Sequence, residues 1–351
     1  MSRYDRQIQL PEIGPEGQKK LAKARVLLIG VGGLGSPAAL YLAAAGVGQL
    51  GLVDDDVVSL SNLQRQILFE TAAQGQKKVS EAARRLRNLN PEIRVNEHDV
   101  ALSAANALEL FGQYDIVVDG TDNFKTRYLI SKACLETGKP HIYGGIFKFE
   151  GHVAIFEPNQ TACYRCLFTE VPRSDEIPNC SEAGVLGALP GIIGSTQALE
   201  VLKLILGLAK PGSLFVFDAL HLESRNLCVD RKPDCPHCGV NAQSFKELYA
   251  SDSIDELQNR KQILTTDEFN SHGLTHAVWI DVRSENEFAT SHKPGARNIP
   301  ISRLADELAT LDRRQTYVVY CASGQRSLAA QDLLLRQGFA DVWNLRPGLG
   351  F

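Results

Sequence analysis

The sequence predicts an α/β protein with two units, a doubly wound parallel sheet and a smaller α/β unit behind it. Short apolar stretches alternate with Ala/Leu-rich or amphipathic stretches, and a glycine-rich turn follows the first of them. The alternation begins again after a polar segment. Such alternation is typical of parallel sheets covered by helices. A chain of 351 residues also suits one large domain and one small domain.

The expected elements follow from this alternation. In the first unit we expect strands at Ala24–Ile29, Leu50–Val53, Asp115–Val118 and His141–Tyr143, with helices at Ser36–Ala45, Lys77–Leu89 and Lys125–Glu136. In the second unit we expect strands at Ala277–Asp281 and Tyr317–Tyr320 and helices at Arg303–Thr310 and Ser327–Gln337. We place the first domain at residues 1–242, a polar linker at 243–259 and the second domain at 260–351.

Composition excludes several classes of protein. Hydrophobic residues make up 44% and charged residues 22%, which are ordinary values for a folded globular chain. The net charge of -4 and the scattered arginines argue against a general nucleic-acid binder. The start, Met1–Leu10, carries charge, and the most apolar stretch, Val185–Leu208, contains Pro190, Glu200 and Lys203. We therefore expect neither export nor a membrane span, and place the protein in the cytoplasm.

A phosphate-binding turn is predicted directly after the first strand. The glycines of this G-x-G-x-x-G pattern are Gly30, Gly32, Gly33 and Gly35. Without side chains, backbone N–H groups and a helix N-terminus approach a phosphate. Asp54 ends the second strand, where a Rossmann-like domain places the acidic residue that meets a ribose hydroxyl. The pattern alone fits dinucleotide-dependent dehydrogenases equally well.

Four further motifs make the first part of the chain more specific. They are SLSNLQRQ at 59–66, GQKKV at 75–79, DGTDN at 119–123 and RYDRQ at 3–7. With these motifs, roughly the first 240 residues resemble the MoeB/ThiF-type adenylyltransferases, which are related to ubiquitin-activating enzymes.

The resemblance implies ATP and Mg²⁺ as cofactors rather than NAD. It implies that Asp54 binds the ribose and that three residues surround the triphosphate, namely Asn62, Arg65 and Lys78. Asp122 would hold magnesium, and Arg6 would reach ATP from the neighbouring subunit of a homodimer. The chemistry agrees, because a carboxylate that attacks an α-phosphate needs positive charge around it but no general base.

Two C-x-x-C pairs predict a structural metal site. The four cysteines are Cys163, Cys166, Cys235 and Cys238. Four thiolates form a closed tetrahedral Zn²⁺ site without a vacant position for water. A redox-active C-x-x-C is the alternative, and the presence of two copies weighs against it.

The remaining cysteines of the first unit are single residues. Cys180 aligns with the cysteine on the loop that crosses the family's active site, so we expect it to accept the activated acyl group or to partner a sulfur donor. The alternative for Cys180 is a small buried residue. We expect Cys134 and Cys228 to be core residues.

The second unit contains a cysteine loop after its second strand. The loop Cys321–Arg326 resembles the rhodanese signature, together with three motifs that precede it. These are DVR at 281–283, EF at 287–288 and HKPGA at 292–296. Gly324, the following helix N-terminus and Arg326 would favour a thiolate or persulfide at Cys321. Phosphatases use a loop that is one residue longer. The chain ends in RPGLGF without the family's second glycine and final helix, so we expect a shortened, less stable domain.

The fused arrangement implies two reactions in succession. A ubiquitin-like sulfur-carrier protein ending in Gly-Gly would be adenylated in the first domain and receive sulfur from Cys321 in the second, with a cysteine desulfurase or another donor supplying it. One alternative is an NAD-dependent oxidoreductase, which needs no cluster like Arg6, Arg65 and Lys78. The other is a nucleotide-sensing scaffold with an inert rhodanese-like domain, which does not explain the complete loop around Cys321.

Overall fold

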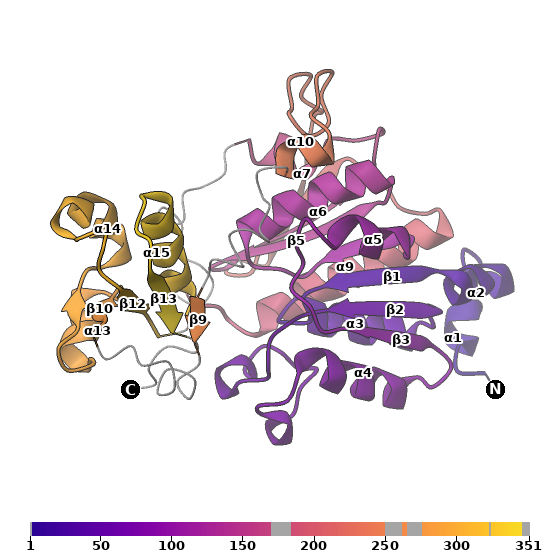
Figure 1. Cartoon of the computed structure of the whole chain (residues 1–351). Helices are drawn as coiled ribbons and strands as arrows, with labels where there is room; N and C mark the ends of the chain where they lie inside the picture. The colour runs from indigo at the N-terminus through magenta and orange to yellow at the C-terminus, as the bar shows by residue number, and fades with distance from the viewer. Residues whose placement is uncertain (1, 170–183, 250–261, 265–275, 323, 346–351) are drawn as a thin grey trace. The chain divides into compact units, whose positions relative to one another are not determined.

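The computed structural model describes residues 2–169, 184–249, 262–264, 276–322 and 324–345. The described residues fall into two compact units, one up to Tyr249 and the other from Gln262 onward (Figure 1). Each unit has a sheet of its own.

The sheet of the first unit has eight strands in the order β3-β2-β1-β4-β5-β6-β7-β8. Its strands are β1 (Arg25–Ile29), β2 (Gln49–Val53), β3 (Arg94–His98), β4 (Ile116–Asp119), β5 (His141–Phe147), β6 (Glu150–Phe156), β7 (Ser213–Asp218) and β8 (Glu223–Cys228). The pairs from β3 to β5 are parallel, whereas β6, β7 and β8 add an antiparallel half. From β1 the chain continues to β2 and β3 on one side of the sheet and then returns to β4 on the other side of β1. The topological switch point therefore lies between β1 and β4.

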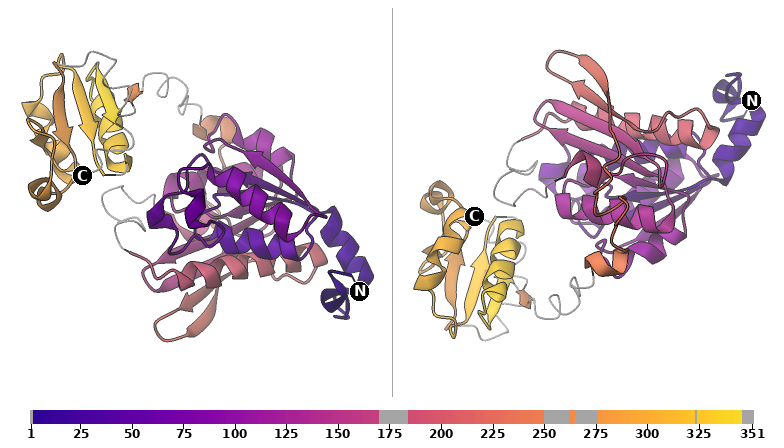
Figure 2. Two further views of the ribbon diagram at one scale, coloured as in Figure 1. Left: turned by 90° about the horizontal axis from the view of Figure 1, so that it is seen from below. Right: turned by 90° about the horizontal axis from the view of Figure 1, so that it is seen from above.

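Helices cover both faces of this sheet (Figure 2). The helices of this unit are α1 (Asp5–Ile8), α2 (Gly14–Lys23), α3 (Gly35–Ala44), α4 (Lys78–Leu89), α5 (Ala107–Gly112), α6 (Phe124–Thr137), α7 (Tyr164–Leu167), α9 (Ala188–Leu206) and α10 (Phe245–Tyr249), with 3-10 turns η1 (Leu60–Asn62) and η2 (Thr71–Ala73). Alternate residues of β1 enter different cores: Val26 and Leu28 pack with α3, α4 and α9, whereas Leu27 and Ile29 pack with α5 and α6. After Arg25 the strand is apolar, because both of its faces are buried.

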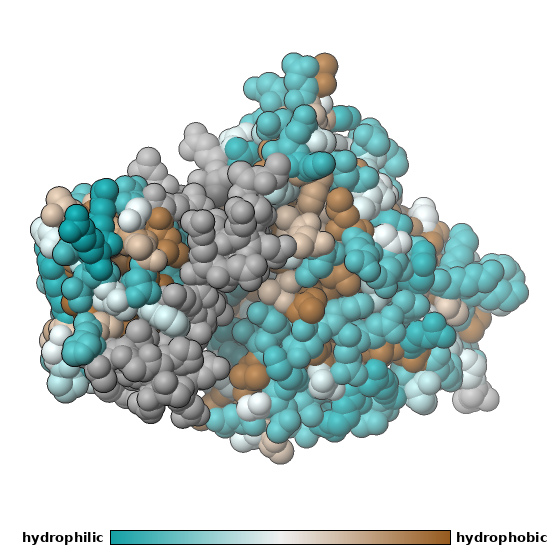
Figure 3. Space-filling view, in the orientation of Figure 1, coloured by the Kyte–Doolittle hydropathy of each residue, from teal (hydrophilic) through white to brown (hydrophobic). Residues whose placement is uncertain are grey.

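One described helix, α9, is long and apolar enough to cross a membrane by length and composition. It packs instead on the sheet, with Leu189 and Ile193 beside Val153 of β6, and with Val201 in the core that includes α3. Its apolar composition is therefore that of a core helix. The face of the first unit seen in Figure 3 is largely hydrophilic, with hydrophobic residues in small groups.

The sheet of the second unit has five strands in the order β11-β10-β12-β13-β9, and the neighbouring strands are parallel. Its elements are β9 (Gln262–Leu264), β10 (Val278–Asp281), α13 (Glu285–Thr290), β11 (Arg297–Asn298), α14 (Ile301–Glu307), η3 (Leu308–Thr310), β12 (Tyr317–Tyr320), α15 (Gln325–Arg336) and β13 (Val342–Leu345). One core joins β10, β12 and β13 to α14 and α15. The doubly wound α/β class and the smaller α/β unit expected from the sequence are both confirmed.

Two parts of the first unit differ from the sequence expectation. The strand expected at His141–Tyr143 runs on to Phe147 and turns into an antiparallel hairpin with β6. Part of the segment expected to be a linker, Phe245–Tyr249, forms α10, where Phe245 is buried in the core beneath α6. The residues around Phe245 are mostly polar, so their composition did not predict a helix that packs on the core.

Candidate active sites and metal centre

A pocket lies at the carboxyl ends of the parallel strands, at the switch point between β1 and β4. Three glycines of the predicted turn line it, namely Gly30, Gly32 and Gly33. Gly30 has a φ of +84°, which favours glycine, and α3 begins five residues later. A Cβ atom on Gly35 would collide with the carbonyl oxygen of Gly30, so Gly35 permits the turn to close rather than lining the pocket.

Two residues of opposite charge stand side by side on one wall. The Asp54 carboxylate accepts hydrogen bonds from the backbone N–H groups of Val31 and Asp56, each at 3.0 Å. The Lys78 ammonium lies 2.9 Å from Asp56 and 3.9 Å from Asp54, and its side chain is only 6% exposed. Burial raises the pKa of Asp54, while Lys78 and the two N–H donors oppose that shift. The buried lysine is thus held by carboxylates at a place where a phosphate can also reach it.

The SLSNLQRQ motif supplies a second polar wall. The Asn62 side chain completes a capping box with Ser59 around η1, which fixes this short helix beside the pocket. Arg65 donates to the carbonyl oxygen of Ser61 at 3.1 Å, and both Asn62 and Arg65 line the pocket. Within the part of the chain that the structure describes, no carboxylate forms an ion pair with Arg65.

A turn after β4 supplies the third wall. Gly120, Thr121 and Asp122 all line the pocket, and the Asp122 side chain is exposed. Thr121 donates its N–H and its hydroxyl to the buried Asp119 carboxylate at 3.0 and 2.7 Å. Asp122 is an exposed carboxylate in the same pocket as Lys78 and Arg65, and it offers the oxygen ligands that a phosphate-bound divalent cation prefers. Asp122 therefore fits the expected magnesium.

Arg6 lies far from the pocket of its own chain. It is exposed on α1, and its neighbour Gln7 donates to the carbonyl oxygen of Ala45, at the end of α3 opposite to the glycine turn. A ten-residue helix is about 15 Å long, so α3 alone separates the two regions. Among the predicted nucleotide-binding residues that the structure describes, Gly35 and Arg6 do not line the pocket.

The four cysteines of the two C-x-x-C pairs meet in one buried cluster. Their sulfur atoms all lie within 4.8 Å of one another, with Cys163 Sγ 3.7 Å from Cys235 Sγ and Cys166 Sγ 3.4 Å from Cys238 Sγ. A tetrahedron with Zn–S bonds of about 2.3 Å has sulfur atoms about 3.8 Å apart, so the cluster fits zinc. The four thiols are all buried, which suits the structural role expected for this site.

The other cysteines of the first unit behave differently from one another. Cys134 lies on α6 and is buried in the core that this helix shares with β1 and β4, as expected. Cys228 is exposed, so its expected core position was wrong: β8 is the edge strand, and every one of its residues is exposed. Cys180 lies outside the described residues.

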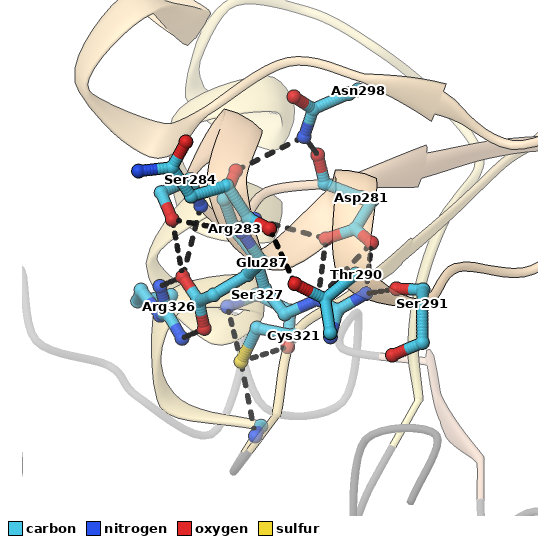
Figure 4. A network of polar contacts seen from close by, with 12 residues as sticks. Asp281, Arg283, Ser284, Glu287, Thr290, Ser291, Asn298, Cys321, Arg326 and Ser327 are labelled. Carbon is cyan, nitrogen blue, oxygen red and sulfur yellow. Dashed lines mark hydrogen bonds and ion pairs between the residues drawn. The ribbon is translucent and has the colours of Figure 1, made fainter. Parts of the chain in front are cut away.

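Backbone donors surround the sulfur of the second unit (Figure 4). Cys321 is buried directly after β12, and its Sγ accepts hydrogen bonds from the N–H groups of Gly324 at 3.1 Å and Ser327 at 3.4 Å. The Ser327 hydroxyl lies 3.4 Å from the same sulfur. Gly324 has a φ of +81° and precedes α15, so the helix N-terminus faces the sulfur. These donors suit an anionic sulfur.

Arg326 forms an ion pair with a carboxylate, whereas the sequence predicted that its charge would act on the Cys321 sulfur. Its two terminal nitrogens donate to the two Glu287 oxygens at 2.7 and 2.8 Å. Glu287 also accepts from the N–H and hydroxyl of Ser284, which completes a capping box at the start of α13. The hydrogen bond from Arg326 lowers the pKa of Glu287 to about 2. The positive potential expected from Arg326 is therefore opposed by a neighbouring negative charge.

The sequence motifs did not include three participants in the first site. Asp56 binds Lys78, the buried Arg127 lines the pocket, and Ile146 of β5 lies on its rim. Arg127 stands on α6, only four residues after the DGTDN motif, so helical spacing from that motif could have indicated it. Asp56 and Ile146 depend on loop and hairpin geometry that no local pattern indicates.

Family models match both units. The model described as the ThiF family matches residues 4–237, and that of the Rhodanese-like domain matches residues 253–350. The chain belongs to the ThiF family. Its second unit is a rhodanese-like domain, as its cysteine loop indicated.

Two relatives of this ThiF-family chain match nearly its whole length, and a third matches about two thirds of it. "Adenylyltransferase and sulfurtransferase MOCS3-2" of Zea mays is 40% identical, and the match covers 99% of this chain and 78% of that protein. "Probable adenylyltransferase/sulfurtransferase MoeZ" of Mycobacterium tuberculosis is 39% identical over 99% of this chain and 92% of that protein. "Sulfur carrier protein adenylyltransferase" of Thermus thermophilus is 48% identical and covers 68% of this chain, with 91% of its own length matched.

Solved structures support the fold of the ThiF-family unit. The crystal structure of E. coli MccB with MccA-N7isoASN superimposes with a TM-score of 0.60 at 24% identity, covering 68% of this chain and 75% of that chain. At this identity the likeness shows the fold alone.

Proposed function

We propose that this chain adenylates the C-terminal carboxylate of a ubiquitin-like sulfur-carrier protein with ATP, and then converts that carboxylate to a thiocarboxylate through a persulfide on Cys321. The single observation that carries the first activity is the pocket at the switch point. The residues that line it include Asp54, Asn62, Arg65, Lys78 and Asp122. A dinucleotide pyrophosphate needs no such cluster, which argues against an NAD-dependent oxidoreductase.

In the adenylation step, an oxygen of the carrier's carboxylate bonds to the α-phosphorus of ATP and the bond to pyrophosphate breaks. The carboxylate is already ionised near neutral pH, so the protein's task is to stabilise negative charge. Arg65 and Lys78 supply fixed positive charge for the phosphates, and Asp54 accepts from a ribose hydroxyl. Magnesium, when bound at Asp122, would neutralise further charge on the triphosphate.

In the sulfur-transfer step, the terminal sulfur of a Cys321 persulfide attacks the acyl carbon and AMP leaves. This forms an acyl disulfide with Cys321. A second thiol then attacks the Cys321 sulfur, which releases the thiocarboxylate and leaves a disulfide. Two further thiols reduce this disulfide and form a disulfide of their own. Cys180 is our candidate for the second thiol. A cysteine desulfurase or another persulfide donor restores the persulfide on Cys321.

Two neighbouring turns offer a docking surface for the carrier. We define the apolar turns as the exposed Phe147, Phe149, Leu220 and Leu222. The strand register brings them together, because Phe147 pairs with Glu150, Glu150 with Asp218 and Asp218 with Glu223. The first turn directly follows the pocket residue Ile146. A small globular carrier that packs on these side chains could extend its Gly-Gly tail into the pocket.

The position of Arg6 supports a homodimer. Because Arg6 is exposed at the end of α3 opposite to its own pocket, it can serve ATP only in the pocket of a second chain. We propose that two chains exchange their N-terminal segments in this way. We also place the enzyme in the cytoplasm, where reduced thiols and ATP are both available.

The test is a reconstitution with the purified chain, ATP, magnesium and a carrier that ends in Gly-Gly. Carrier-dependent exchange of pyrophosphate into ATP is expected, and addition of a persulfide donor should add about 16 mass units to the carrier when sulfur replaces oxygen. A matched carrier that lacks its last glycine should support neither reaction. Exchange that does not depend on the carrier would contradict the proposed substrate.

A further inference from the structure

A buried arginine lies directly behind the nucleotide pocket. Arg127 stands in the first half of α6, is only 6% exposed, and contributes to the pocket wall. Its guanidinium lies over the rings of Phe124 and Tyr143, with centroid distances of 5.6 and 5.4 Å. Burying a guanidinium among rings costs free energy unless the protein uses its charge and donors. The contacts of Arg127 show which groups its charge and its N–H donors bind.

The guanidinium holds the turn that carries Asp122. An Nη atom of Arg127 donates to the main-chain carbonyl oxygen of Thr121 at 2.7 Å. On the other side of the same residue, the N–H and hydroxyl of Thr121 donate to the Asp119 carboxylate at 3.0 and 2.7 Å. The buried guanidinium of Arg127 therefore binds the carbonyl oxygen of Thr121. The buried carboxylate of Asp119 binds the N–H and hydroxyl groups of the same residue. Asp122 is the next residue, so its backbone is fixed from both sides.

Asp119 is itself held by residues of two other elements, β5 and α9. His141 Nε2 lies 3.3 Å from Asp119 Oδ2, and the Gln197 amide donates to the Asp119 backbone oxygen at 2.8 Å. Asp119, His141 and Gln197 are all at most 1% exposed. The turn also touches the glycine loop, because a Cβ atom on Gly120 would lie 2.6 Å from the Gly30 carbonyl oxygen. A shift of the turn would therefore alter both walls of the pocket.

In the described part of the chain, Arg127 is not part of a buried ion pair with a carboxylate. Among the described residues no carboxylate lies within ion-pair distance of it, and its buried Nε has no hydrogen-bond partner. A simple structural role in the core would be served better by an apolar residue of similar volume. A cation held against the carbonyl of Thr121 is instead suited to keep the following residue, Asp122, in one orientation.

We propose that Arg127 is a positioning residue for adenylation, which holds the Gly120–Asp122 turn so that the Asp122 carboxylate faces magnesium-bound phosphates. The proposal rests on the function proposed above. It assigns no contact between Arg127 and the nucleotide. Its consequence is specific: loss of Arg127 should weaken the contribution of magnesium to nucleotide binding more than nucleotide binding itself.

The experiment measures binding of α,β-methylene-ATP to the full chain by calorimetry, with MgCl2 and separately with EDTA. In Arg127→Gln we expect about a tenfold loss in affinity with MgCl2, the size of one charge-assisted hydrogen bond, and less than a twofold change with EDTA. Arg127→Lys keeps the charge and a donor, so it should recover part of the loss. Lys125→Gln removes an exposed positive charge from the same helix and is the matched control.

The outcomes separate this inference from the proposed function. Equal losses of affinity in MgCl2 and EDTA, or an unchanged affinity in both, would overturn the positioning role of Arg127. If Arg127→Gln fails to fold, as judged by circular dichroism, the comparison of Arg127→Lys with Lys125→Gln decides in the same way. If the parent chain binds the nucleotide without any effect of magnesium, the proposed magnesium site at Asp122 fails, and the inference fails with it.

Discussion

In the nucleotide pocket, Arg65 donates to the main-chain carbonyl of Ser61, whereas in the cysteine loop Arg326 donates to both oxygens of Glu287. The first arrangement leaves the positive charge of an arginine for a ligand that arrives from outside. The second neutralises the arginine within the protein, so backbone N–H groups serve the sulfur. The difference matches the chemistry: a triphosphate brings several negative charges, but a persulfide brings only one.

The two sites also share no residue. The pocket residues belong to the first unit and the Cys321 loop to the second, and the described residues of each unit have their own core. Substitutions should therefore separate the two reactions rather than weaken both.

Cys321→Ala should abolish sulfur transfer and leave adenylation unchanged. The variant loses the only atom that carries the persulfide in the proposed reaction, so thiosulfate:cyanide sulfurtransferase activity should fall to background. Carrier-dependent pyrophosphate exchange should stay within about twofold of the parent, because the pocket lies in the other unit. Formation of thiocarboxylate at the parent rate, with a persulfide donor and without free sulfide, would show that another cysteine is the donor.

Arg65→Ala should have the converse effect. Removing one preorganised charge from the site of phosphoryl transfer typically costs about 100- to 1000-fold in rate, and we expect pyrophosphate exchange to fall by that factor. Sulfurtransferase activity should be unaffected. Arg84→Ala is the control, since Arg84 is exposed and pairs only locally with Glu81 at 2.8 Å. An exchange rate for Arg65→Ala equal to that of the control would exclude Arg65 from the reaction.

The sequence predicted those features that depend on local patterns. The glycine turn, the polar motifs and the two C-x-x-C pairs were evident because short-range spacing encodes them, and the structure brings the four cysteine sulfurs within 4.8 Å of one another. Of the predicted nucleotide-binding residues, Asp54, Asn62, Arg65, Lys78 and Asp122 line one pocket.

What the sequence did not predict depends on long-range packing. Nothing local shows that Lys78 meets Asp56 or that Arg326 meets Glu287, because these partners lie 22 and 39 residues apart. The exposure of Cys228 likewise depends on β8 being the edge strand of a sheet whose antiparallel half was not anticipated. Ionic partners and sheet edges are settled only by the tertiary fold.

Cys235→Ser should destabilise the first unit alone. A four-thiolate site binds zinc most strongly when its ligands are held together, so the binding free energy becomes folding free energy. We expect a loss of zinc by elemental analysis. In calorimetry, the melting temperature of the first unit should fall by several degrees. Cys228→Ser, in an exposed cysteine outside the cluster, is the matched control. A full equivalent of zinc in Cys235→Ser would mean that this cysteine is not a ligand.

The smallest effect concerns the ion pair of the second unit. The pKa of Glu287 is lowered from 4.5 to about 2, first through its hydrogen bond from Arg326. Because the folded pKa is depressed, the pair stabilises the unit above the unfolded value of 4.5, and the stabilisation is lost as the pH falls from 4.5 toward 2. The Glu287 side chain is 37% exposed, so solvent screening limits the contribution to about 1 kcal/mol.

Glu287→Gln should therefore be less stable than the parent near pH 7, and the difference should shrink as the pH falls below about 4.5. Both tryptophans of the chain, Trp279 and Trp343, belong to the second unit, so urea unfolding followed by tryptophan fluorescence reports on that unit in the full-length protein. Glu285→Gln is the control, because Glu285 stands on the same helix and pairs with Arg303 at an exposed position. A difference between Glu287→Gln and the parent that stays constant from pH 7 to pH 3 would show that the carboxylate of Glu287 does not stabilise the loop through its charge. In that case Arg326 would be available to the sulfur after all, and the contrast between the two sites would have to be abandoned.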